Sequence, residues 1–231
     1  MKVVICGAQS VGKTTLINSL PDKYKDKIVT GVLRKILIST PGDMTHSEDA
    51  DAYTQTKFFD TLWNELVKRK DYISDRGLVD VVAYSKYLGE SRKLGIGIYQ
   101  IQMRELKEWA SKHKDEVYVY IPIEFEIIDD GLRSLDKEFQ SGIDRSIREV
   151  LDDSGIKYIV IKGSNEKRLA DFVKALSDIE KGKKLKNDNV LEKLPPKKYP
   201  KTEKSTTKIA DTKQPTKDGI IFEGKKFKIK K

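Results

Sequence analysis

The chain has 231 residues, of which 38% are hydrophobic and 35% charged, and its formal net charge is +9. This length predicts one ordinary domain with an extension, or two small domains. The sequence contains neither a signal-peptide pattern nor an apolar run long enough to cross a bilayer, so no membrane association is expected. The single cysteine, Cys6, excludes an internal disulfide and fits a cytoplasmic location.

The positive charge is concentrated towards the C-terminal end. Residues 181–231 contain 17 lysines, no arginine and six acidic residues, whereas residues 1–180 are close to neutral. Because Lys, Thr, Pro and Ser dominate 181–218, we expect a flexible, disordered linker there. Residues 219–231 contain two short β-like runs around Glu223-Gly224, which predict a small hairpin or a strand that adds to a partner's sheet.

The first element in chain order is a short apolar strand, Val3–Cys6, and the segment after it, Gly7–Thr14, has the form G-x-x-x-x-G-K-T. A helical pattern follows directly, which is the context of a phosphate-binding P-loop. Glycines let the backbone amides turn towards phosphate oxygens, the lysine reaches the terminal phosphates, and the threonine hydroxyl can ligate Mg²⁺. The expected nucleotide-binding residues are Gly7, Ala8, Gln9, Ser10, Val11, Gly12, Lys13, Thr14 and Thr15.

Strands and helices alternate in the rest of residues 1–180. Further strands are expected at 27–30, 72–75, 117–123 and 157–161, and helices at 31–38, 58–67, 78–88, 96–113, 136–151 and 170–179. This alternation predicts an α/β fold, a five-stranded parallel sheet flanked by helices, with the ligand at the carboxyl ends of the strands. The polar stretch 41–51 is expected to be a solvated surface loop; His46 and its acidic neighbours lack the spacing of a metal site.

A carboxylate ends the strand at 72–75. Asp75 is expected at the carboxyl edge of the sheet beside the P-loop, where it could hold Mg²⁺ through water or accept the proton of an attacking hydroxyl. Arg76 follows it and could contact a phosphate or the substrate. The alternative is an ordinary turn, since Asp, Arg and Gly are all common in turns.

A second charged segment follows the strand at 117–123. It reads Asp129-Asp130-Gly131-Leu132-Arg133-Ser134, and Arg145 and Arg148 lie on the next helix. The planar guanidinium suits the charge on a transferring phosphoryl group, so Arg133 is a candidate catalytic residue together with Lys13, Asp75 and Arg76. For Arg145 and Arg148, a solvated helix face is an equally good interpretation.

Taken together, Gly7–Thr14, Asp75-Arg76-Gly77 with Asp80 and Ala83-Tyr84, and Asp130–Arg133 resemble the AAA-type P-loop kinases related to ribosylnicotinamide kinase. The resemblance covers roughly residues 1–180. It implies a five-stranded kinase-like sheet, ATP with Mg²⁺ as the donor, and a hydroxyl of a nucleoside-like substrate as the acceptor. Lys13, Thr14, Asp75 and Arg133 carry over by position, with Thr14 and Asp75 at the metal.

The sequence departs from that family at one place. Such kinases often have a glutamate just after the second strand, whereas this chain has Gly31 in that neighbourhood. Either Asp75 acts as the base, or a carboxylate from the 43–51 loop does, or the substrate is not a standard nucleoside.

The leading functional interpretation is therefore a kinase of a nucleoside, nucleotide or related small substrate. A kinase acting on a DNA or RNA end or on a modified-base hydroxyl is the alternative, with the basic tail as a tether. A GTPase lacks support because Ile161–Lys167 does not contain the guanine-reading Asn-Lys-x-Asp. A non-catalytic nucleotide-binding protein and a homodimer stay open.

Overall fold

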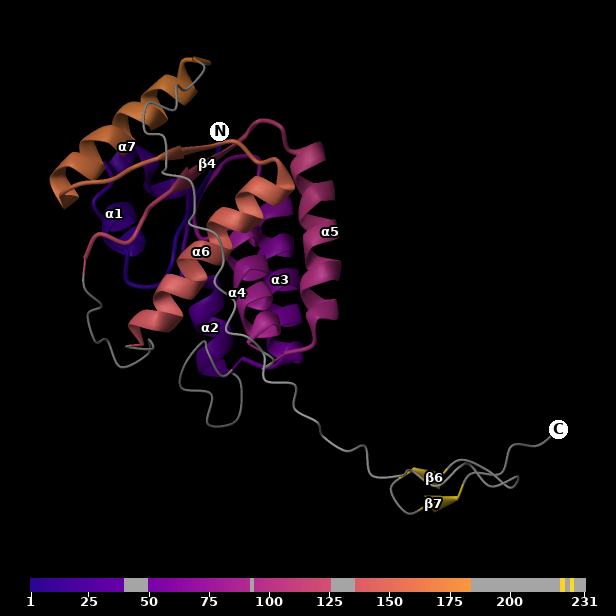
Figure 1. Ribbon diagram of the computed structural model, residues 1–231. Coiled ribbons are helices and arrows are strands. Elements are labelled where there is room, and N and C mark those ends of the chain that lie inside the picture. The colour runs from indigo at the N-terminus through magenta and orange to yellow at the C-terminus, as the bar shows by residue number, and fades with distance from the viewer. Residues whose placement is uncertain (40–49, 92–93, 126–135, 184–220, 223–224, 227–231) are drawn as a thin grey trace. The chain divides into compact units, whose positions relative to one another are not determined.

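Five parallel strands form the central sheet of the computed structural model, which describes residues 1–39, 50–91, 94–125, 136–183, 221–222 and 225–226 (Figure 1). The strands are β1 (Lys2–Cys6), β2 (Ile28–Val29), β3 (Tyr72–Asp75), β4 (Glu116–Tyr120) and β5 (Tyr158–Val160). Their order is β2-β3-β1-β4-β5, and each neighbouring pair is parallel. The predicted α/β class and the five-stranded parallel sheet are confirmed.

Helices cover both faces of this sheet. They are α1 (Lys13–Asn18), α2 (Val32–Ser39), α3 (Ala52–Val67), α4 (Leu78–Glu90), α5 (Ile96–Lys112), α6 (Lys137–Ser154) and α7 (Asn165–Glu180), with a short 3-10 helix at Asp22–Lys27. Helix α4 packs against α3, α5 and α6, whereas α1 packs against α7. Figure 1 shows these two groups on opposite faces of the sheet. None of the helices in the described ranges is long and apolar enough to span a bilayer.

Strand β1, which leads into the P-loop, is buried at the centre of the sheet. Residues Val3, Val4, Ile5 and Cys6 have no exposed surface, because β1 lies between β3 and β4 and has helices on both faces. An all-apolar strand is typical of this position in a parallel sheet. Cys6 is a buried free thiol, as expected, and burial raises its pKa well above the ordinary value.

Several element boundaries differ from the expectation. Helix α3, for example, begins at Ala52, where Asp51 caps it, instead of at residue 58. Two further differences also have a local cause. Strand β4 ends at Tyr120 instead of residue 123, because its neighbour β1 turns away into the P-loop at Gly7 and leaves later residues without a strand to pair with. Helix α7 begins at Asn165 instead of residue 170, because the Ser164 hydroxyl caps it by accepting the Lys167 amide.

A buried carboxylate stabilises the amino edge of the sheet, opposite the P-loop. Glu116, at the start of β4, accepts hydrogen bonds from the hydroxyls of Tyr72 and Tyr118 and from the indole nitrogen of Trp109. Burial and the Glu116 charge raise the pKa of both tyrosines, so both stay protonated and donate. This cluster therefore ties α5 to β3 and β4 at the edge remote from the P-loop.

We expect a large loss of stability when Gly77, which lies between β3 and α4, is replaced. A Cβ at this residue would lie 2.3 Å from Cγ1 of Val4 in the buried strand β1. We expect Gly77→Ala to lower the free energy of unfolding by about 2–3 kcal/mol, since the core must shift to admit one methyl group. Urea unfolding followed by circular dichroism measures this change.

Gly97 provides the matched control for that substitution. It lies in the first turn of α5, and a Cβ there would meet no atom within 4 Å. Gly97→Ala should leave stability unchanged or raise it by at most about 1 kcal/mol, because alanine restricts the unfolded chain. Equal stabilities for the two variants would contradict the steric argument.

The second unit of the chain, Leu194–Lys231, contains the pair of strands β6 (Ile221–Phe222) and β7 (Lys225–Lys226). They pair in the antiparallel sense. The expected linker at 181–218 lies almost wholly outside the described residues.

Candidate functional site

The P-loop runs from the carboxyl end of β1 into α1, and its backbone has the conformations that a phosphate cradle requires. Gly12 has φ 89° and Ser10 has φ 61°, both left-handed. A Cβ at Gly7 would lie 2.6 Å from the carbonyl oxygen of Ile121, so only glycine fits there. Successive amides in such a turn form an anion-binding concavity, to which the positive end of α1 contributes.

The Lys13 side chain is folded back along the loop. Its Nζ donates to the carbonyl oxygens of Gly7 at 2.7 Å and Ala8 at 2.5 Å, and the residue is almost fully buried. These contacts hold the ammonium group beside the concavity. It could exchange them for terminal phosphate oxygens without leaving the loop.

The structure brings Thr14 and Asp75 together, although they are 61 positions apart in the chain. Asp75 lies opposite Ile5 in the β1–β3 pair, and the Thr14 hydroxyl donates to its Oδ2 at 2.7 Å. The Thr30 hydroxyl, which follows β2, approaches the same oxygen at 3.4 Å. The second oxygen of Asp75, Oδ1, is buried and has no hydrogen-bond partner within the described part of the chain.

That unpartnered oxygen is relevant to metal binding. A carboxylate oxygen without a donor, next to a threonine hydroxyl at the start of the P-loop helix, is an oxygen donor set that suits Mg²⁺. The residues present therefore fit the metal expected from the sequence. Among the described residues there is no cluster of three or more His, Cys, Asp or Glu side chains that could hold a metal by itself.

Arg76 occupies an unusual backbone conformation next to this pair. Its φ is 94°, which is uncommon for a residue with a side chain, and its amide donates to the carbonyl oxygen of Ile5 at 3.0 Å. The guanidinium lies over the ring of Tyr84, 5.6 Å from its centroid, and its Nη1 is 3.8 Å from Oδ1 of Asp80. The turn thus directs Arg76 towards α4 at the carboxyl edge of the sheet.

Three side chains from other elements hold the P-loop, namely Tyr84, Gln140 and Arg168. The sequence pattern did not single out Gln140 or Arg168, whereas Tyr84 belonged to the family resemblance. Gln9 is buried; its Oε1 accepts from the Tyr84 hydroxyl at 3.0 Å and its carbonyl oxygen accepts from Gln140 Nε2 at 2.7 Å. Arg168 of α7 donates to the Val11 carbonyl oxygen and to Glu124, each at 2.6 Å. The sequence signal that could have identified Arg168 is its helical spacing from Phe172 and Leu176, because all three lie on the buried face of α7.

The remaining candidate residues have different positions. Arg133, with the rest of 129–134, lies outside the described residues, as do 43–49 of the acidic loop. Asp51 of that loop is described and caps α3 by accepting the Thr54 amide at 2.8 Å. Arg148 pairs through Nε with Asp144 at 3.5 Å, and Arg145 is half-buried. Gly31 has φ 73°, and the two residues directly after β2, Thr30 and Gly31, carry no carboxylate.

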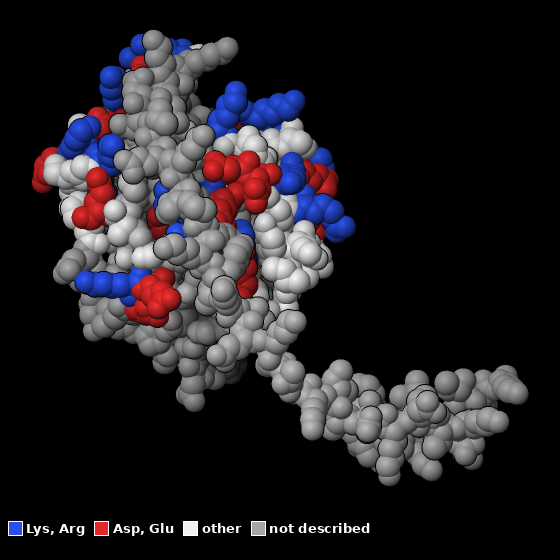
Figure 2. Space-filling model, viewed as in Figure 1, with Lys and Arg blue, Asp and Glu red and all other residues white. Residues whose placement is uncertain are grey.

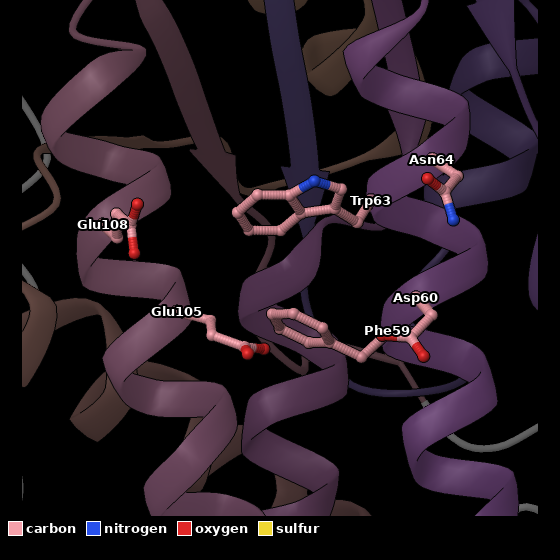
Figure 3. A pocket seen from close by; sticks show the side chains of 6 residues that line it. All are labelled: Phe59, Asp60, Trp63, Asn64, Glu105 and Glu108. Carbon is pink, nitrogen blue, oxygen red and sulfur yellow. The ribbon is translucent and has the colours of Figure 1, made fainter.

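A separate groove lies between α3 and α5. It has a volume of about 340 Å³ and is lined by aromatic and acidic side chains, namely Phe59, Asp60, Trp63, Asn64, Glu105 and Glu108 (Figure 3). None of these six belongs to the P-loop. The face of the molecule drawn in Figure 2 shows basic and acidic side chains intermingled over the described residues, in keeping with the near-neutral composition of residues 1–180.

The P-loop, the strand-end carboxylate beside it and the five-stranded parallel sheet define a P-loop protein with a kinase-like fold. A family model described as an AAA domain matches residues 2–168. The chain belongs to this family, which confirms the resemblance drawn from Gly7–Thr14 and Asp75–Tyr84. No curated protein matches the chain.

Solved structures show the same fold at low sequence identity. Deoxyadenosine kinase from M. mycoides, with dCMP and dCDP bound, is 14% identical, has a TM-score of 0.57, and is matched over 78% of this chain and 100% of its own. The NadR protein in complex with NR is 13% identical, with a TM-score of 0.56, covering 84% of this chain and 53% of that one. The YorR protein from Bacillus subtilis is 17% identical, with a TM-score of 0.50, covering 78% and 98%.

Proposed function

We propose that this protein is an ATP- and Mg²⁺-dependent kinase that transfers the γ-phosphoryl group to a hydroxyl of a nucleoside, nucleotide or related small substrate. The observation that carries the proposal is the Thr14–Asp75 pair at the start of the P-loop helix, with the second Asp75 oxygen buried and unpartnered. A nucleoside or nucleotide substrate is supported by two proteins that share this fold: deoxyadenosine kinase, and YorR, which was solved with a nucleotide bound.

In this proposal, the amides of residues 7–15 bind the phosphates and Lys13 neutralises the terminal ones. Thr14 and Asp75 would hold Mg²⁺, which would supply positive charge to offset that of the phosphates. Arg76 contacts the phosphoryl group or the acceptor. Arg133 is assigned the same kind of role from the segment 129–134. Most of the rate enhancement then comes from positioning and charge neutralisation.

The general base has two candidates. Asp75 is the only carboxylate that the described residues place against Thr14. The acidic loop 43–51 supplies the other candidates, apart from Asp51, whose carboxylate is used by the α3 cap. A base from this loop would take the place of the glutamate that related kinases often have after the second strand.

A transfer assay tests the proposal directly. Full-length protein is incubated with Mg²⁺ and ATP labelled at the γ-phosphate, together with nucleosides, nucleoside monophosphates, or DNA with and without modified bases. Labelled product from a nucleoside or nucleotide is expected. Tight ATP binding without transfer to any acceptor would point instead to a non-catalytic nucleotide-binding protein.

The alternative of a nucleic-acid kinase rests on the 17 lysines of residues 181–231. We propose residues 1–180 as the catalytic domain, in the cytoplasm, and the basic segment as an accessory to it. Removal of 194–231 should leave the turnover of a small substrate within about 2-fold of the full chain. It should weaken DNA binding at low salt only if the segment is a tether. Filter binding at 50 and 200 mM salt, next to the turnover assay, separates the two functions.

A further inference from the structure

Asp80, in the first turn of α4, joins the two chain segments that carry the proposed catalytic groups. Its side chain is fully buried. Oδ1 accepts the amide of Gly7 at 3.1 Å, and Oδ2 accepts the amide of Gly77 at 2.8 Å. Gly7 opens the P-loop, and Gly77 directly follows Arg76. One carboxylate therefore fixes the start of the phosphate cradle against the turn that carries Asp75 and Arg76.

Only part of this arrangement is ordinary helix capping. A carboxylate at the third position of a helix commonly accepts an amide at the helix start, and the bond from Gly77 is of this kind. The bond from Gly7 is different, because it joins α4 to the residue that follows β1, 73 positions away in the chain. The approach of Arg76 Nη1 to 3.8 Å adds a cation to the same carboxylate.

A cation and two amide donors surround the buried carboxylate of Asp80. Burial raises the pKa of Asp80 above its ordinary value, while Arg76, Lys13 and the two amides lower it. A buried carboxylate is costly unless it is paired and hydrogen-bonded, and here both conditions are met. The left-handed φ of Arg76 means that the turn needs such outside contacts to persist.

We propose that Asp80 is a positioning residue for phosphoryl transfer. It holds the Arg76 guanidinium at a fixed position relative to the P-loop. This inference rests on the proposed kinase function. Asp80 itself touches neither nucleotide nor acceptor in this assignment. It acts through Arg76, and its bond from the Gly7 amide anchors it to the P-loop.

The kinetic test uses Asp80→Asn, Arg76→Gln and the double variant in the full chain. Asparagine keeps the shape of the side chain, but it loses the charge and one acceptor oxygen. We expect Asp80→Asn to lower kcat by about 10–100-fold while KM for ATP changes by less than about 3-fold. Because Asp80 acts through Arg76, the double variant should be no more than about 2-fold slower than Arg76→Gln. Effects that multiply, or an unchanged kcat, would overturn the inference.

Glu116→Gln is the control for a general loss of stability. Glu116 is also a buried carboxylate with several donors, but it lies at the opposite edge of the sheet. This variant should lower the melting temperature without changing kcat per folded molecule. If it lowers kcat as much as Asp80→Asn does, the Asp80 effect is merely structural.

Amide hydrogen exchange gives a readout that does not depend on catalysis, and its first measurement uses the wild-type protein alone. In the nucleotide-free wild-type protein, the amides of Gly7 and Gly77 should exchange as slowly as those of β1. In Asp80→Asn, both should exchange at least about 10-fold faster while Val4 is unaffected. Fast exchange of Gly7 in the wild type would sink the positioning role. Slow exchange in a protein that transfers no phosphate would show that the kinase assignment, and not the Asp80 contact, had failed.

Discussion

Asp75→Asn is expected to lower kcat of the proposed kinase by about 10²–10⁴-fold while the fold stays intact. The amide keeps the shape of the side chain and can still accept from Thr14, which now donates to Oδ2 at 2.7 Å. It removes the negative charge, however, and with it the attraction for a divalent cation at the buried Oδ1. Steady-state kinetics at several Mg²⁺ concentrations, with circular dichroism of both proteins, measures the change.

Thr30→Val is the control for this substitution. The Thr30 hydroxyl approaches the same carboxylate oxygen at 3.4 Å, but it comes from the residue after β2 and not from the P-loop helix. We expect a change in kcat of less than about 5-fold, since a long contact to one oxygen is lost and the charge remains. If Asp75→Asn were as active as Thr30→Val, the metal or base role would belong to a different residue.

Lys13→Ala should reduce phosphoryl transfer by about 10³-fold or more, the other large effect we expect. The ammonium group donates to two carbonyl oxygens of the P-loop, those of Gly7 and Ala8. Its removal leaves the amides to bind the phosphates without a mobile charge that can follow the terminal phosphate. Titration with a fluorescent ATP analogue and single-turnover transfer separate lost binding from lost chemistry.

Lys112→Ala controls for the loss of a lysine as such. Lys112 is exposed at the end of α5 and pairs with Glu108. Pairs of this kind contribute little to stability, so transfer should be unchanged. Substantial activity in Lys13→Ala would remove the P-loop assignment itself.

Local patterns in the sequence were sufficient to predict the strands, the helices and the phosphate cradle. The apolar strand Val3–Cys6 followed by Gly7–Thr14 predicted both the central strand and the turn, because a P-loop encodes its conformation within a dozen residues. The position of Asp75 beside that loop also followed from its place at a strand end, since parallel strands end at one edge of a sheet.

Contacts between distant segments could not be predicted in the same way. The bonds from Gln140 to Gln9 and from Arg168 to Val11 join residues 131 and 157 positions apart, and no local motif records such pairs. The same holds for Asp80, which the resemblance included without a role. The role of Arg133 stays a prediction, because it lies outside the described residues.

The contact between Arg168 and the Val11 carbonyl oxygen has a practical consequence for dissecting the protein. The guanidinium also binds Glu124 and lies 4.6 Å from the ring centroid of Phe125, so the P-loop is held in part by helix α7. A fragment that stops at the end of β5 would contain every motif residue but would lack Arg168 and its contact with the P-loop. We expect such a shortened protein to bind nucleotide poorly, so the smallest useful fragment must extend through α7.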